Sequence, residues 1–163
     1  MQLRPAFLCG VAILAGCSTL GSARRCRPVD LALNPDPAVL EMLRVYTGAD
    51  GVSHGEMVPL AGTSTKYLGM LLTQYSLGDP SNVVIVNGPP DFHIPRHAAP
   101  YREIFLTLRG SVTVELSDGT TRDLHPGALL LYEDVTGPGH GGHVGPCGYT
   151  SLDLQFKPPA AAP

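Results

Sequence analysis

Three residues whose side chains commonly bind metal ions lie at the borders of strand-like segments between positions 97 and 140. His97 precedes an apolar segment, Glu103 begins that segment, and His140 follows a glycine-containing loop. Two imidazoles and one carboxylate are the ligand set typical of non-haem iron and similar divalent ions, which keep coordination positions open. The same residue types also suit polar side chains that simply form hydrogen bonds at strand ends, so both interpretations stand at this point.

From Val45 onward the sequence shows the two-residue period of β-strands. The candidate strands are GEMVPL, KYLGMLLTQYSL, NVVIV, EIFLTLR, SVTVELS, TTRDL, GALLLYE, GHVG and YTSLDLQF. Asp118-Gly119 is a strong hairpin-turn signal between two of them. The 19 glycines and 16 prolines suit many short strands joined by tight turns. We therefore expect an all-β sandwich, barrel or jelly roll.

The segment EIFLTLR has bulky residues on both of its faces. One face has Glu103, Phe105 and Thr107, and the other has only aliphatic side chains. We expect both faces to be covered, which places Glu103 on a partly buried face where an ionised carboxylate needs a partner. That partner is a metal ion, another cation, or one of the flanking arginines, Arg102 and Arg109.

The N-terminal residues have the layout of a secretory signal. Arg4 precedes an apolar stretch, Ala6 to Ala15, that is too short to span a bilayer comfortably. Leu14-Ala15-Gly16-Cys17 resembles the lipobox of bacterial lipoproteins, in which the cysteine is diacylated on its thiol and becomes the first residue of the mature chain. The resemblance implies a signal peptide over 1–16, and acyl chains on Cys17, palmitate among them, would anchor the protein without a transmembrane helix.

Ser18, which follows that cysteine in place of Asp, favours outer-membrane delivery by the same resemblance. We therefore expect the protein at the periplasmic face of the outer membrane. Residues 17–35 are expected to be a flexible tether and 158–163 a disordered tail. Residues 36–157 form the expected domain. Asp36-Pro37 is a helix-start signal and predicts a short helix over PAVLEML, residues 37–43.

Two cysteines remain once Cys9 leaves with the signal and Cys17 is lipidated. These are Cys26, in the predicted tether, and Cys147. In an oxidising compartment such thiols either pair or stay unpaired. The sequence does not show that they meet in space, so both alternatives remain open.

The stretch from His97 to His140 resembles the two motifs of the cupin family. Glu103 followed by Gly110 matches the end of the first motif, and Pro126-Gly127 opens the strand pair of the second. HAAPYRE and EDVTGPGH are also similar to segments of small bacterial single-domain cupins. The resemblance covers 45–156 and implies a cupin fold, a double-stranded β-helix or jelly-roll barrel.

Cupins commonly bind a divalent ion, such as iron, manganese, nickel, zinc or copper, inside the barrel. Carried over residue by residue, the resemblance assigns His97, Glu103 and His140 as metal ligands. This chain departs from the pattern, because Ala99 stands where a second histidine of the first motif is expected. His140 also lies further beyond the Pro-Gly turn than is usual. His93, four residues before His97, is a candidate for the fourth ligand.

Other polar residues near these motifs are weaker candidates. Tyr101 and Arg102 are candidates to orient an anionic ligand. Glu133 in EDVTG is either a general base at the mouth of the pocket, with Asp134 beside it, or part of a solvated turn. The remaining histidines are expected in turns or on the surface: His54, His125 and His143.

Composition and motifs restrict the function classes. A net charge of −3 without a basic run gives no reason to expect a nucleic-acid partner. No nucleophile motif, phosphate-binding loop or cysteine-rich zinc pattern occurs. Three classes remain: a binding module for a metal or small molecule, a metal-dependent dioxygenase or isomerase, and a non-catalytic envelope protein. Cupin barrels commonly pair through a sheet, so the resemblance implies a homodimer, which the aliphatic face of EIFLTLR would suit.

Overall fold

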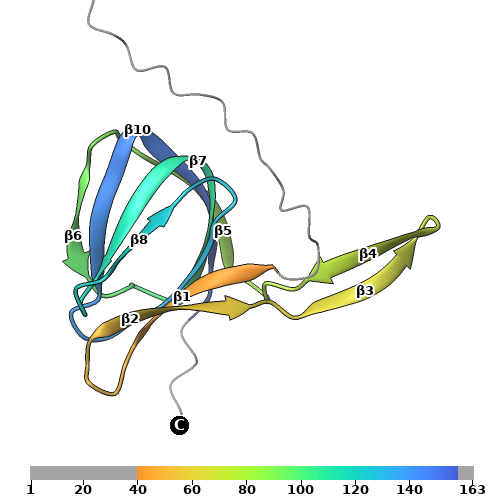
Figure 1. Ribbon diagram of the computed structural model, residues 1–163, viewed down its shortest axis with the longest axis horizontal. Helices are drawn as coiled ribbons and strands as arrows, with labels where there is room; N and C mark the ends of the chain where they lie inside the picture. Colours follow the sequence, from red (N-terminus) through yellow and green to blue (C-terminus); the bar gives the residue numbers. More distant parts are fainter. Residues whose placement is uncertain (1–39, 158–163) are drawn as a thin grey trace, which may run out of the picture.

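The computed structural model describes residues 40–157, and all regular secondary structure in this range is β (Figure 1). The strands are β1 (Glu41–Thr47), β2 (Ser53–Pro59), β3 (Gly62–Tyr67), β4 (Met70–Tyr75), β5 (Asn82–Gly88), β6 (His93–His97), β7 (Glu103–Leu116), β8 (Thr121–Leu124), β9 (Leu129–Glu133) and β10 (His140–Gln155). The all-β class predicted from the alternating pattern is confirmed. Within 40–157 no helix is long and apolar enough to cross a bilayer.

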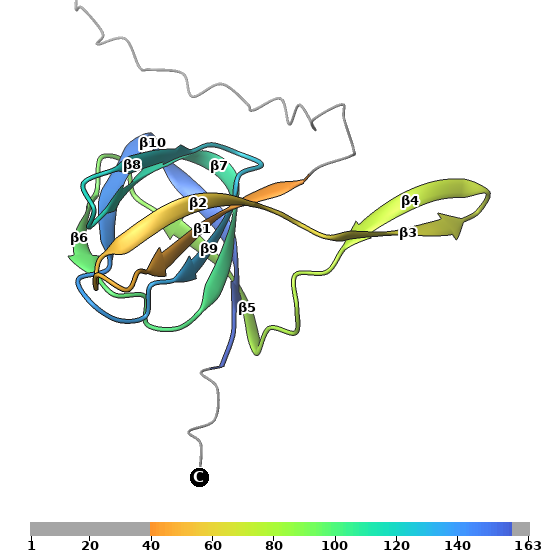
Figure 2. The same cartoon turned by 60° about the horizontal axis from the view of Figure 1, so that its bottom comes forward.

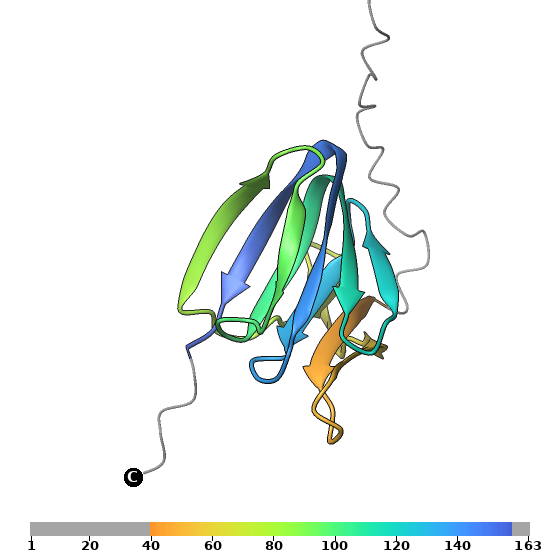
Figure 3. The ribbon, with the colours of Figure 1, turned by 90° about the vertical axis from the view of Figure 1, so that its left-hand side faces the viewer.

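Eight strands form one sheet, in the order β2-β1-β9-β7-β10-β5, with β6 beside β10 and β8 beside β7. Only β1 and β9 pair in parallel; the other pairs of this sheet are antiparallel. The sheet curls around an interior, so it has an inner and an outer face (Figures 1 and 3). β3 and β4 form a separate two-stranded sheet, here called the arm, which projects from the curled sheet (Figure 2).

Both faces of the sheet bury apolar side chains. The inner core consists of Leu43, Val45, Ala99, Val114, Leu116, Leu124, Leu130 and Tyr132. A smaller outer cluster consists of Met42, Ile104, Leu129 and Leu131, with Leu60, Leu77 and Phe156 packed against it. The prediction that both faces of EIFLTLR are covered is therefore confirmed. Glu103 begins β7 on the inner face and is buried, as expected.

The short helix predicted over residues 37–43 is wrong in its described part, because Glu41–Leu43 belong to β1. Met42 is buried on the outer face and Leu43 on the inner face. Consecutive apolar residues are therefore expected in this segment, because a strand covered on both sides buries side chains on both of its faces. Positions 37–39 lie outside the described residues, as do the predicted signal peptide, the lipidated Cys17, the tether and the tail.

Other expected strands are joined or divided. EIFLTLR and most of SVTVELS form the single strand β7, and GHVG and most of YTSLDLQF lie in β10. KYLGMLLTQYSL, expected as one strand, is split by a turn at Leu68-Gly69, where both residues have positive φ, 48° and 85°. Such backbone angles are those of a type I′ hairpin turn. The predicted turn at Asp118-Gly119 is confirmed, with the Gly119 N–H donating to the Leu116 carbonyl. Strand β6 was not predicted.

Cys147 lies on β10 and is disulfide-bonded. Cys26, the candidate partner from the sequence analysis, lies outside the described residues. The pairing of Cys26 with Cys147 therefore stays a prediction.

Candidate functional site

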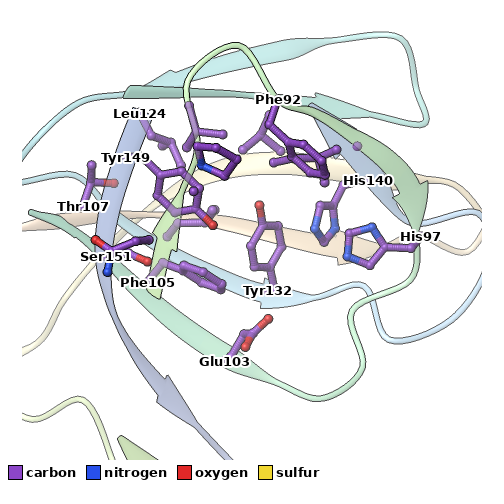
Figure 4. Close-up of a pocket in the computed structure, with 18 residues that line it drawn as sticks. Phe92, His97, Glu103, Phe105, Thr107, Leu124, Tyr132, His140, Tyr149 and Ser151 are labelled. Atoms are coloured by element: carbon purple, nitrogen blue, oxygen red, sulfur yellow. The ribbon is translucent and has the colours of Figure 1, made fainter. Parts of the chain in front are cut away.

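A cavity of about 300 Å³ opens on the inner face of the sheet (Figure 4). Its apolar walls include Phe92, Ile94, Phe105, Val112, Leu124 and Leu130. Its polar lining includes His97, Glu103, Thr107, Tyr132, His140 and Tyr149. An apolar pocket of roughly this size with a few converging polar groups is typical of a binding site for a small molecule.

His97 and His140 form a cross-strand pair at this cavity, here called the inner pair. They are register partners on β6 and β10, and their ring centroids lie 4.8 Å apart. Gly139 makes this approach possible: its φ is +66°, and a Cβ added there would lie 1.9 Å from the His97 carbonyl oxygen. The glycine before His140 thus brings the two strands close enough for their histidines to meet.

His140 is held by two contacts in the interior. Its Nδ1 lies 2.8 Å from Oδ2 of Asp134, a residue that is fully buried. Its ring stacks on Tyr132 with a centroid separation of 3.8 Å and an angle of 11°. A carboxylate accepts the Nδ1 proton, which fixes the tautomer and leaves the Nε2 lone pair of the neutral imidazole without a partner.

His97 has the same tautomer for a different reason. Its Nδ1 lies 2.8 Å from the carbonyl oxygen of Pro95. A carbonyl oxygen only accepts, so Nδ1 bears the hydrogen and Nε2 bears the lone pair. When both rings are neutral, the inner pair therefore presents two Nε2 lone pairs on neighbouring rings.

Glu103 lines the same cavity without a cationic partner. Glu103 is 7% exposed, and among residues 40–157 its carboxylate forms no ion pair. Loss of hydration, with a smaller contribution from the charges of Asp153 and Asp134, raises the pKa of Glu103 to about 7. The alternative of a salt bridge from Arg102 is wrong, because the Arg102 guanidinium bonds Glu133 at 2.7 Å.

The structure brings two of the three predicted ligands into contact and places the third in the same cavity. Figure 4 shows His97 and His140 side by side, with Glu103 apart from them. Within the described part of the chain, no group of three His, Cys, Asp or Glu side chains is arranged to hold a metal ion. The inner pair is thus a two-nitrogen site with a carboxylate elsewhere on the same wall.

Asp153 is a third buried carboxylate, and the sequence analysis did not single it out. It lies on the inner face of β10, is 2% exposed, and has a pKa raised to about 6, because loss of hydration outweighs contact with Ser151. The available signal was the alternation of YTSLDLQ, which places Ser151 and Asp153 opposite the leucines. Together with Glu103 and Asp134, it gives the interior an acidic character.

His93, the candidate fourth ligand, does not line the cavity. It lies on the opposite face of β6, where its Nδ1 is 3.3 Å from Nε2 of His143 on β10. Nδ1 of His143 in turn lies 2.7 Å from a carboxylate oxygen of Glu115. We call His93 and His143 the outer pair.

The weaker candidates also lie outside the cavity lining. Glu133 bonds both Arg44 and Arg102 at 2.7 Å, and although burial raises the pKa of Glu133, these bonds bring it below its usual value. A carboxylate held in this way is a poor general base. Neither Tyr101 nor Arg102 is among the residues that line the cavity, and their role in orienting a ligand stays a prediction. His54 bonds Asp50 and Asp118, and His125 is exposed.

Comparison with known proteins adds no family: no family model matches this chain, and no curated protein matches it. The functional case therefore rests on the geometry of the cavity.

Proposed function

We propose that the chain is a cupin whose jelly-roll barrel binds a divalent metal ion at the inner pair and a small molecule beside it. In this proposal the protein is lipid-anchored at Cys17, at the periplasmic face of the outer membrane. The observation behind the proposal is that His97 and His140 are in contact at the cavity wall, each with its Nε2 lone pair available.

The hydrogen bonds of the inner pair suit metal ligation. A metal-ligating histidine typically donates its other N–H to a carboxylate or a backbone carbonyl, which orients the ring and increases its basicity. Asp134 and the Pro95 carbonyl are acceptors of these two kinds. Glu103 would add a carboxylate from the same cavity, and a bound cation would favour its ionised form.

The rest of the lining restricts the small molecule. Among the described residues that line the cavity there is no Lys or Arg. An anionic ligand would therefore meet no protein cation, and the buried carboxylates would repel it. The lining suits a neutral, largely apolar molecule that donates hydrogen bonds or coordinates the metal through an oxygen, which the ion would polarise.

An enzyme is the second candidate, and one observation favours it. Asp134 and His140 form a buried carboxylate–imidazole pair, and Glu103 has a pKa of about 7 in the same cavity. A carboxyl group with a pKa near neutral, in the same cavity as an imidazole, is suited to general acid–base catalysis. This reading corresponds to the dioxygenase or isomerase class, in which these residues would move protons while the metal binds substrate oxygen.

The test is the metal content of the purified chain after exposure to iron, manganese, nickel, copper and zinc in turn. We expect near one equivalent in the parent and its loss in the His97→Ala/His140→Ala variant. The matched control is His93→Ala/His143→Ala, which removes two histidines from the same two strands and is expected to keep the metal. A parent that stays metal-free with all five ions, or equal loss in both variants, would show the proposed metal site to be wrong.

A further inference from the structure

The arm exposes a continuous set of large apolar side chains. Tyr67, Leu68, Met70 and Leu71 are 59%, 82%, 56% and 77% exposed. Leu68 also occupies the tip of the hairpin with a positive φ of 48°, a backbone conformation that leucine rarely adopts and that a turn usually assigns to Asn or Gly. A leucine in this position is costly in water unless another surface covers it.

The arm also lacks the features that protect a solvent-exposed hairpin. It forms a two-stranded sheet of its own, and such a sheet is marginally stable in water unless something packs against it. Lys66 is its only charged residue between Gly62 and Tyr75, whereas exposed strand edges are usually protected by several charges. A large exposed apolar patch of this kind marks a contact surface.

A second apolar surface lies on the outer face of the curled sheet. Two aliphatic rows cross β7, β10 and β5 in register, Leu106–Leu152–Ile85 and Ile104–Leu154–Val83. The β7 end of these rows is covered by Leu60, Leu77 and Phe156 within the same chain. The β5 end is open, because Val83 and Ile85 are 52% and 64% exposed. The apolar surface available to a partner is therefore at β5, beyond the part of EIFLTLR that the chain covers itself.

The arm and the β5 surface adjoin one another. Figures 1 and 2 both show β5 on the side of the curled sheet from which the arm projects. Leu60 and Leu77, at the two ends of the arm, pack on the outer cluster of their own chain. The strands between them run away from the sheet, so the tip lies beyond its own β5 surface (Figure 2). β5 is also an edge strand of the eight-stranded sheet.

We propose that the arm is a dimerisation element that lies against the β5 surface of a second copy of this chain, in a reciprocal exchange. Because each copy displays one apolar projection next to one apolar face, a single two-fold axis covers both on both copies, as a closed symmetric interface requires. A different partner protein would have to supply two complementary surfaces, whereas a second copy supplies both. The proposal is independent of what the cavity binds.

The experiment measures the mass of the full chain in solution by sedimentation equilibrium. We expect twice the chain mass for the parent and the monomer mass for two independent variants, Leu68→Asp/Leu71→Asp in the arm and Ile85→Asp on β5. Val135→Asp is the matched control. Val135 is also apolar and 47% exposed, but its neighbour Thr136 contacts Thr47 at the end of the sheet away from the arm. The control is expected to remain dimeric, and circular dichroism verifies that every variant is folded.

The position of the arm is tested separately by a photo-crosslinking residue in place of Leu71. In a mixture of ¹⁴N- and ¹⁵N-labelled chains, we expect mixed-isotope crosslinks to peptides from β5 or β10. A monomeric parent, or a folded arm variant that remains dimeric, would overturn the proposal. Crosslinks confined within single chains, or directed to β2 of the second copy, would also overturn it.

Discussion

Strands β6 and β10 hold two histidine pairs of the same ring geometry on opposite faces of one sheet. In both pairs the ring centroids are 4.8 Å apart and the planes are tilted by 54°. In both, the β10 histidine bonds a carboxylate through Nδ1: Asp134 at 2.8 Å inside and Glu115 at 2.7 Å outside. They differ in exposure, since the side chains of Asp134 and His140 are 0% and 6% exposed and those of Glu115 and His143 are 32% and 56% exposed.

This difference determines what each pair can do. Water competes for and screens every contact of the outer pair, whereas the inner carboxylate–imidazole bond forms in an interior of low effective dielectric. The outer histidines also bond one another, which uses a nitrogen lone pair that the inner histidines leave available. Matching ring geometry is therefore insufficient for a site. The burial of His140, together with an unused lone pair, distinguishes the inner pair, whose other member, His97, is exposed.

The largest contrast is expected when each carboxylate is removed. Asp134→Ala leaves a buried imidazole N–H without its acceptor and is expected to lower the free energy of unfolding by about 3 kcal/mol. Glu115→Ala exposes His143 to water that replaces the lost bond, so we expect a change below about 0.5 kcal/mol. Urea unfolding of the two variants beside the parent measures both. Equal effects would mean that burial does not separate the two pairs.

The next largest contrast between Asp134 and Glu115 is expected in the metal affinity of their amide variants. Asp134→Asn keeps an oxygen acceptor for His140 but removes the charge that increases the basicity of the ring, so we expect roughly 10–100-fold weaker binding. Glu115→Gln is expected to leave the affinity within about twofold, because the Glu115 carboxylate bonds His143 of the outer pair. Competition against a chromophoric chelator measures the dissociation constants. An unchanged affinity in Asp134→Asn would remove this carboxylate from the proposed metal site.

The pH dependence of stability is expected to distinguish Glu103 from the exposed Glu115. The pKa of Glu103 is raised from 4.5 to about 7, so the folded state binds this proton more tightly than the unfolded state does. The resulting stabilisation is present below pH 4.5 and is lost as the pH rises through 7. Glu103→Gln should therefore raise the free energy of unfolding at pH 8 by on the order of 1–2 kcal/mol, a value reduced by the solvent that reaches the cavity, and change it little at pH 4.

Urea unfolding of the metal-free chain at the two pH values tests this expectation, with Glu115→Gln as the matched control. Asp153, whose pKa is also raised, remains in both variants and leaves a residual slope near pH 6. A Glu103→Gln variant with the same pH dependence as the parent would contradict the absence of a cationic partner for Glu103.

Alternation along the strands was enough to predict much of this site. The two-residue period predicted the all-β class and placed Glu103 on a buried face, because the face of each side chain follows from local sequence. It could not show that Asp134, which we interpreted as either a turn residue or a neighbour of a base, bonds His140. That contact depends on the curl of the sheet and on the loop between β9 and β10. Nor does alternation show which residues of β6 and β10 face one another.

The predicted helix at residues 37–43 also shows that local sequence does not reveal long-range strand pairing. PAVLEML contains too few residues to distinguish a helical period from a strand that is covered on both faces. Its described part pairs with β9, almost ninety positions away, as in the register of Leu43 with Leu130. Such a long-range pairing overrides a local helix-start signal. The missed strand β6 likewise exists through its pairing with β10.

The smallest effect is expected from removing the outer pair itself. His93→Ala/His143→Ala should change the free energy of unfolding by less than about 0.5 kcal/mol, because these rings are open to water and their hydrogen bonds are replaced by hydration. His140→Ala, which removes one ring from the inner pair, should cost roughly 2–3 kcal/mol, since it leaves Asp134 as a buried charge without a partner and removes the surface on which Tyr132 stacks. Thermal and urea unfolding of the two variants without metal compare the pairs directly. If His93→Ala/His143→Ala were as unstable as His140→Ala, both pairs would be structural contacts between β6 and β10. Stability would then not distinguish the inner pair from the outer pair.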